Sequence, residues 1–139
     1  MNSENRISLN PTASDVARFN TWFDLKCVES AIESNLAADL KLCLNEVLAN
    51  LISYGFKDTA EPTAIVEIKL EPGCAAATVT DNGSYFDMRS WQVPRDRDLM
   101  TGEPGGFGIA LINERATRLF STRVGELNHL VVVCEGSTP

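Results

Sequence analysis

Apolar residues occupy every second position between residues 64 and 70, and Glu67 and Lys69 stand between them. A period of two is typical of a β-strand that buries one face. The turn-forming residues 71–73 follow, and residues 75–80 are predicted to return as a second strand. Strands joined by so short a turn must be antiparallel. The chain therefore has to fold around an antiparallel or mixed sheet.

A second hairpin is predicted at residues 119–134, where two apolar segments flank a turn. Three other segments have helical apolar spacing. One begins at a capping box formed by Thr12 and Asp15, one runs from about Asn35 to Tyr54, and one starts at Gly108. This order of elements predicts an α+β two-layer sandwich, in which a mixed, mostly antiparallel sheet carries helices on one face.

The second of these helices has one continuous apolar stripe, which we expect to be buried against the sheet. Its members are Leu36, Leu40, Cys43, Val47, Leu51 and Tyr54. Glu46 and Asn50 lie beside that stripe, one helical turn from each other. A carboxylate and a carboxamide that face the same way could hold a water molecule and a divalent cation. The same pair is also common on a solvated helix surface.

Two further motifs combine glycine with a predicted element boundary. Asp81-Asn82-Gly83 ends a predicted strand, and these are also ordinary turn residues. Gly105-Gly106-Phe107-Gly108 precedes a predicted helix, and alone it would be read as a flexible linker. Glycines before a helix also allow backbone amides to approach phosphate oxygens, which the positive end of the helix attracts.

The 139 residues suit a single domain, 1–139, with one core. Residues 88–104 have no convincing periodicity, and a loop of that length is usually functional.

The formal net charge of −7 disfavours direct binding to a nucleic acid. The sequence predicts no membrane span and no signal peptide, so we expect a cytoplasmic protein. The four cysteines are too scattered for a zinc site, which agrees with a reducing compartment.

In their order along the chain, the Glu46–Asn50 helix and the two glycine motifs resemble the ATP-binding domain of gyrase, Hsp-type chaperones, histidine kinases and mismatch-repair proteins. The likeness is greatest to the small anti-sigma-factor serine kinases and extends from about Ile7 to Cys134. Phe86-Asp87, which follows the Asp81-Asn82-Gly83 motif, resembles the residues at this place in those kinases. Tyr85 is a departure, because the broader superfamily often has a second glycine there.

The resemblance implies an ATP site. Asp81 would accept a hydrogen bond from the adenine amino group, and Gly83 would let the base lie against the backbone. The phosphates would lie in the second glycine motif. The positions implied to contact the nucleotide are Asn50, Asp81, Gly83, Phe86, Gly106, Gly108 and Leu111. Asn128-His129 opens the last predicted strand, where the family has a small polar residue near the adenine. By the same resemblance His129 would lie near this pocket, and we interpret it as a strand residue without a catalytic role.

The same resemblance implies the chemistry. Asn50 would coordinate Mg²⁺ together with the ATP phosphates, and Glu46 would act as the general base toward a serine hydroxyl on a protein partner. Residues 88–104 would form a lid over the nucleotide. Within that lid, Arg95 and Arg97 would reach either the phosphates or the partner, although they could also be solvated loop charges.

We therefore expect a cytoplasmic protein-serine kinase that phosphorylates an anti-anti-sigma partner of the STAS type and sequesters a sigma factor, most naturally as a homodimer. Four alternatives remain. The chain could be a switch that binds ATP without hydrolysing it, or a regulatory serine kinase with no sigma target. It could also be a fragment of a histidine kinase, or a domain of this fold that binds no nucleotide.

Overall fold

The computed structural model describes residues 5–85 and 111–136, and the elements below lie in those two segments. Five strands form one sheet in the order β1-β2-β3-β5-β4, with every neighbouring pair antiparallel. The strands are β1 (Arg6–Leu9), β2 (Ala64–Glu71), β3 (Cys74–Asp81), β4 (Arg118–Val124) and β5 (Leu127–Glu135). The predicted α+β fold and both predicted hairpins are confirmed.

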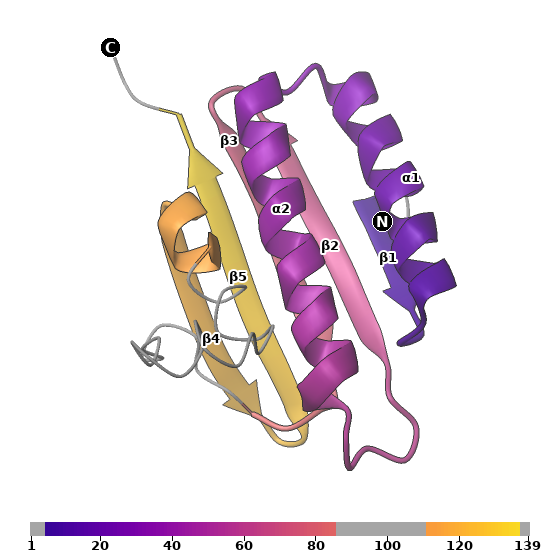
Figure 1. The fold of residues 1–139 in the computed structure, drawn as a ribbon. Coiled ribbons are helices and arrows are strands. Elements are labelled where there is room, and N and C mark those ends of the chain that lie inside the picture. The colour runs from indigo at the N-terminus through magenta and orange to yellow at the C-terminus, as the bar shows by residue number, and fades with distance from the viewer. Residues whose placement is uncertain (1–4, 86–110, 137–139) are drawn as a thin grey trace, which may run out of the picture.

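Helices α1 (Ala13–Ser30) and α2 (Ser34–Asn50) lie side by side over one face of the sheet (Figure 1). A π-helical turn, η2 (Leu51–Gly55), continues α2, because the Phe56 N–H bonds the Leu51 carbonyl oxygen at 2.9 Å. Residues 111–115 form another helical turn beside β4 and β5, coloured orange in Figure 1. The predicted two-layer arrangement is therefore confirmed.

The start of α1 follows the predicted capping box. The Thr12 Oγ1 atom accepts a 3.1 Å hydrogen bond from the Asp15 N–H, and Asp15 Oδ2 accepts one of 2.6 Å from the Asn10 N–H. The Asn10 N–H and the Arg18 guanidinium together lower the pKa of Asp15. The helix ends at Ala31, which has a left-handed backbone conformation (φ 56°). Local hydrogen bonds thus set the start of α1, and the left-handed cap residue Ala31 follows its last residue, Ser30.

The core lies between the two helices and the sheet. The buried residues of α2 are Leu36, Leu40, Cys43, Leu44, Val47 and Leu48. They pack in one cluster with the apolar face of the sheet, including Val66, Val79 and Val132. Leu51 is buried as predicted, whereas Tyr54 is 50% exposed. The π-helical turn explains this difference, because its wider winding rotates the positions after Leu51 away from the predicted stripe.

The other face of the sheet carries no helix in the described part of the chain (Figure 1). A shallow hollow of about 600 Å³ lies there, between Glu67, Lys69 and Thr78. The predicted site residues of α2 and the end of β3 belong instead to the helix-covered side, because Asp81 follows Ala77 and Val79 on the buried face. The candidate site is therefore at the edge of the core rather than on the open face.

Candidate functional site

Asp81 ends β3 on the helix-covered face, and only 6% of its surface is exposed. Its Oδ1 atom accepts two hydrogen bonds, one from the Gly83 N–H at 2.8 Å and one from the Asn128 amide nitrogen at 2.9 Å. No hydrogen bond from the described residues uses Oδ2. One carboxylate oxygen is thus held in place, and the other is able to accept a hydrogen bond from a ligand.

Burial raises the pKa of Asp81 above its ordinary value, because desolvation penalises the charged form. The hydrogen bonds from Asn128 and Gly83 oppose that effect, and so do the positive charge of Arg123 and the proximity of His129. Donors and positive charge therefore oppose the effect of burial on this carboxyl group without cancelling it. An acceptor-only anion at this point suits a ligand that presents an N–H donor.

Asn128 and Arg123 complete a polar row across the end of the sheet. Asn128 faces Asp81 across the β3–β5 pairing, and Arg123 faces Asn128 across the β4–β5 pairing. The Arg123 Nη1 atom donates to Asn128 Oδ1 at 2.8 Å and to the Gly83 carbonyl oxygen at 3.0 Å. The Asn128 amide nitrogen lies 3.0 Å from the Gly83 carbonyl oxygen and 3.1 Å from that of Ser84. The row therefore also fixes the backbone that follows Asp81.

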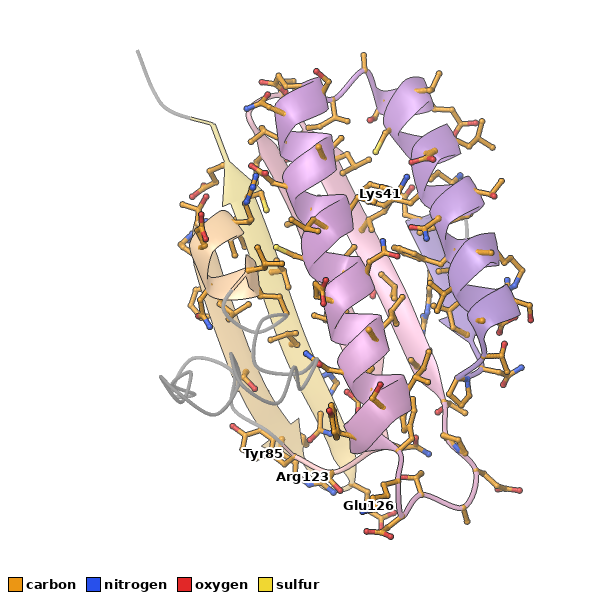
Figure 2. All side chains as sticks on the ribbon, in the orientation of Figure 1. Lys41, Tyr85, Arg123 and Glu126 are labelled. Atoms are coloured by element: carbon orange, nitrogen blue, oxygen red, sulfur yellow. The ribbon has the colours of Figure 1, made fainter. Side chains whose placement is uncertain are left out.

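Sequence reasoning placed Asn128 near the adenine through the resemblance, but it missed the hydrogen bonds of Asn128 and the role of Arg123. The hairpin register places both residues beside the short turn at residues 125–126 and on one face of the sheet, but it does not show that β5 pairs with β3. Figure 2 shows Arg123 at one end of the sheet together with Tyr85 and Glu126, whereas Lys41 lies midway along α2.

His129 is a strand residue, as predicted. It lies on β5 opposite Thr80, and its Nδ1 atom is 3.3 Å from Thr80 Oγ1. Because side chains alternate along a strand, His129 points to the face opposite Asn128 and Asp81. The His129 side chain thus lies outside the polar row.

The end of α2 brings Asn50 and the turn η2 toward this row. The Ser84 N–H donates a 2.9 Å hydrogen bond to the Gly55 carbonyl oxygen, which joins the segment after Asp81 to the end of η2. Glu46 and Asn50 are both half-buried, and they lie one turn apart on α2. The structure thus brings the predicted helix residues to the same end of the domain as Asp81.

The Asn50 side chain contains a buried nitrogen atom, Nδ2, with no hydrogen-bond partner among the described residues. Leaving a buried polar atom unpaired costs about 1–3 kcal/mol, so this amide is suited to a partner from outside the chain. A 180° rotation of the amide exchanges its nitrogen and oxygen, and amide oxygen is a ligand that Mg²⁺ accepts. The residue at the predicted metal position therefore fits the predicted metal.

Leu111 begins the described helical turn and is half-buried, and its neighbour Ile112 is fully buried. The Cys43 thiol of α2 lies 4.0 Å from the Ile112 carbonyl oxygen, so this turn packs beside α2. The other predicted nucleotide contacts, Phe86, Gly106 and Gly108, lie outside the described residues. So do Arg95 and Arg97 of the predicted lid, and these assignments stay predictions.

Within residues 5–85 and 111–136, no three His, Cys, Asp or Glu side chains cluster in a way that could hold a metal ion. A cation bound there would depend on few protein ligands, as magnesium typically does. The described helices include none that is both long and apolar enough to cross a membrane.

Residues 9–134 match the family model of the histidine kinase-like ATPase domain. The chain is 26% identical over 128 residues to the serine/threonine-protein kinase BtrW of Bordetella bronchiseptica, covering 91% of this chain and 89% of that protein. It is 28% identical over 81 residues to the serine-protein kinase RsbW of Listeria innocua, covering 53% of this chain and half of that protein. The match to the sensor histidine kinase YesM of Bacillus subtilis, 32% identical over 94 residues, spans only 16% of YesM.

Among solved structures, the fold is similar to the histidine kinase domain of a blue-light activated histidine kinase from Erythrobacter litoralis. The TM-score is 0.51 at 20% identity, and the match covers 88% of this chain and 59% of the other. At this identity the likeness concerns the fold alone.

Proposed function

Because this chain belongs to the histidine kinase-like ATPase domain family, we propose that it binds ATP with Mg²⁺ and transfers the terminal phosphoryl group to a serine of a protein partner. The observation that carries the proposal is the buried Asp81 carboxylate, in which two donors hold Oδ1 and no described residue donates to Oδ2, so that Oδ2 could accept from a ligand. The adenine amino group is such a donor.

Two residues of α2 would handle the phosphate end. The Asn50 amide oxygen would be the protein ligand of Mg²⁺, and its unpaired amide supports that role. The metal, when bound, neutralises charge on the phosphate oxygens. Glu46 would accept the proton of the serine hydroxyl while the serine oxygen bonds to the terminal phosphorus and ADP leaves. The proton then rests on the Glu46 carboxyl group.

The choice of serine as the acceptor rests on the relatives. BtrW and RsbW are described as serine/threonine- and serine-protein kinases, and the match to BtrW extends over most of both chains. We propose an anti-anti-sigma protein of the STAS type as the substrate, and a sigma factor as the competing ligand. The chain would act in the cytoplasm as a homodimer and would bind no nucleic acid directly.

The test is to incubate the purified protein with Mg–ATP and a STAS-type protein from the same genome, and to search for phosphoserine by mass spectrometry. We expect one modified serine in the wild-type reaction and none with Glu46→Gln. ATP binding without phosphoserine on any STAS-type protein would favour a nucleotide-dependent binding switch. Phosphorylation without binding to any sigma factor would favour a regulatory kinase with a different target.

A further inference from the structure

Arg123 makes two hydrogen bonds from a single nitrogen atom at the end of the sheet. Its Nη1 atom donates to Asn128 Oδ1 at 2.8 Å and to the Gly83 carbonyl oxygen at 3.0 Å. Arg123 lies on β4, whereas Gly83 follows β3, so this side chain spans the strand β5 that separates them. The contact connects an exposed hairpin to the backbone beside the candidate adenine site.

These contacts determine which way the Asn128 amide points. An amide can present either its oxygen or its nitrogen after a 180° rotation. With the guanidinium donating to Oδ1, the amide nitrogen must face Asp81, where it donates to Asp81 Oδ1 at 2.9 Å. The rotated amide would place an oxygen against the carboxylate and its N–H₂ against Arg123, so both contacts would become repulsive.

We propose that Arg123 is a positioning residue for base selection, acting through Asn128 to keep Asp81 as an anionic acceptor. The proposal rests on the proposed ATP site. Asp81 Oδ1 is occupied by Asn128 and Gly83, so Oδ2 is the oxygen that meets the 6-position of a purine. An amino group there is accepted, and a carbonyl oxygen there is repelled unless Asp81 gains a proton.

The first experiment is calorimetric titration with ATP and with inosine triphosphate, whose base has a carbonyl oxygen in place of the adenine amino group. We expect the wild type to prefer ATP. In Arg123→Met the affinity for ATP should fall about tenfold, while that for inosine triphosphate should hold or rise. If Arg123 had only a structural role, its loss would weaken the binding of both nucleotides equally, and that result would overturn the proposal.

The matched control is Arg118→Met. Arg118 lies on the same strand, but it faces Val133 and pairs with Glu135 at 3.2 Å rather than with the polar row. We expect its ATP preference to equal that of the wild type. An equal loss of preference in Arg118→Met and Arg123→Met would assign the effect to β4 as a whole and overturn the role of Arg123.

The pH profile gives a second readout. Among the described residues, the charged or titratable groups that act on Asp81 are Arg123 from β4 and His129 from β5. Loss of the Arg123 charge favours protonated Asp81, so in Arg123→Met the affinity for ATP should begin to fall at a higher pH than in the wild type. Arg123→Lys keeps the charge and should restore the wild-type pH dependence. An unchanged pH dependence in Arg123→Met would count against the proposal.

A double-mutant cycle tests whether Arg123 acts through Asn128. Once Asn128→Ala has removed the amide, adding Arg123→Met should cost little further ATP preference. Fully additive losses would show independent action and overturn that step. Failure of the wild type to bind ATP would overturn the proposed function and this inference together. If Arg123→Met keeps the wild-type preference for ATP over inosine triphosphate, only the inference would be overturned.

Discussion

A Cβ atom on Gly83 would lie 2.6 Å from the carbonyl oxygen of Gly55. That oxygen belongs to the end of η2 and accepts a hydrogen bond from the Ser84 N–H, so it cannot move freely. Backbone from the end of the helix and backbone from the turn after β3 therefore touch directly. Only glycine allows this approach between the two parts of the candidate site.

Gly83→Ala should consequently separate η2 from the turn after Asp81. We expect a loss of about 1–3 kcal/mol in the free energy of unfolding, typical of overpacking at a close contact, and weaker ATP binding. Denaturant unfolding and calorimetry measure the two effects. Gly136→Ala is the control, because a Cβ there has its nearest neighbours at 3.8 Å. Equal stability of the two variants would show that the contact is not tight.

Asp81→Asn should weaken ATP binding without weakening the fold. Burial raises the pKa of Asp81 in the folded state, so the folded protein holds the proton more tightly than the unfolded chain. Stability from this group is full below the unfolded pKa of about 3.9, and it declines as pH rises toward the higher folded value. The substitution removes that decline and keeps an acceptor oxygen for Gly83 and Asn128.

We therefore expect Asp81→Asn to melt at or above the wild-type temperature at pH 7, while its affinity for ATP falls about tenfold. Thermal melts at pH 4 and pH 7 should show a smaller pH dependence than in the wild type. Asp58→Asn on the exposed surface is the control. A variant that melts well below the wild type at pH 7 would contradict the assigned pKa direction.

Asn50→Leu should abolish metal binding while it stabilises the fold. The substitution removes a buried amide nitrogen that has no partner among the described residues, so the nucleotide-free protein should gain up to about 1–3 kcal/mol. Magnesium-dependent ATP binding should be lost. Unfolding with and without Mg–ATP measures both effects. Unchanged magnesium dependence would remove Asn50 from the metal site.

Glu46→Gln should leave ATP binding nearly intact and lower phosphoryl transfer by about 10²–10⁴-fold, because the amide cannot take the serine proton. The measurement combines calorimetry with a phosphoserine assay. Glu126→Gln, in the exposed turn between β4 and β5, is the control. If Glu46→Gln lost binding and transfer in equal measure, Glu46 would be a binding residue and not the base.

Cys43 and Cys134 should resist alkylation in the folded protein. Both are buried, and the contact with Cys134, together with burial, raises the pKa of the Cys43 thiol. The same contact lowers the pKa of Cys134, but only 1% of its surface is exposed. Mass spectrometry after a short exposure to iodoacetamide should find modification first at the half-buried Cys27 and Cys74. Rapid labelling of Cys43 would indicate local opening of α2.

The sheet and helices were predictable because their signals are local. The alternation in β2 and the capping contacts of Thr12 and Asp15 involve residues close in sequence. The π-helical turn was not, because no local residue pattern indicates it.

The candidate site likewise contains one part that was predictable from local motifs and one part that was not. Asp81 and Asn50 could be named from motifs, whereas the Arg123–Asn128–Asp81 row depends on β5 lying between β3 and β4. A hairpin pattern gives the pairing of β4 with β5. It does not say which of the two strands meets β3, so the row could not be derived from the sequence alone.

The position of β5 between β3 and β4 also affects the order of folding. The β2–β3 hairpin closes over a short turn, but the Asp81–Asn128 hydrogen bond joins residues 47 positions apart. Closing that longer loop costs more chain entropy, so we expect β3–β5 pairing to follow hairpin formation during folding. The polar row of Asp81, Asn128 and Arg123 would then be assembled only when the sheet itself is completed, and a partly folded chain would lack the proposed contact with adenine.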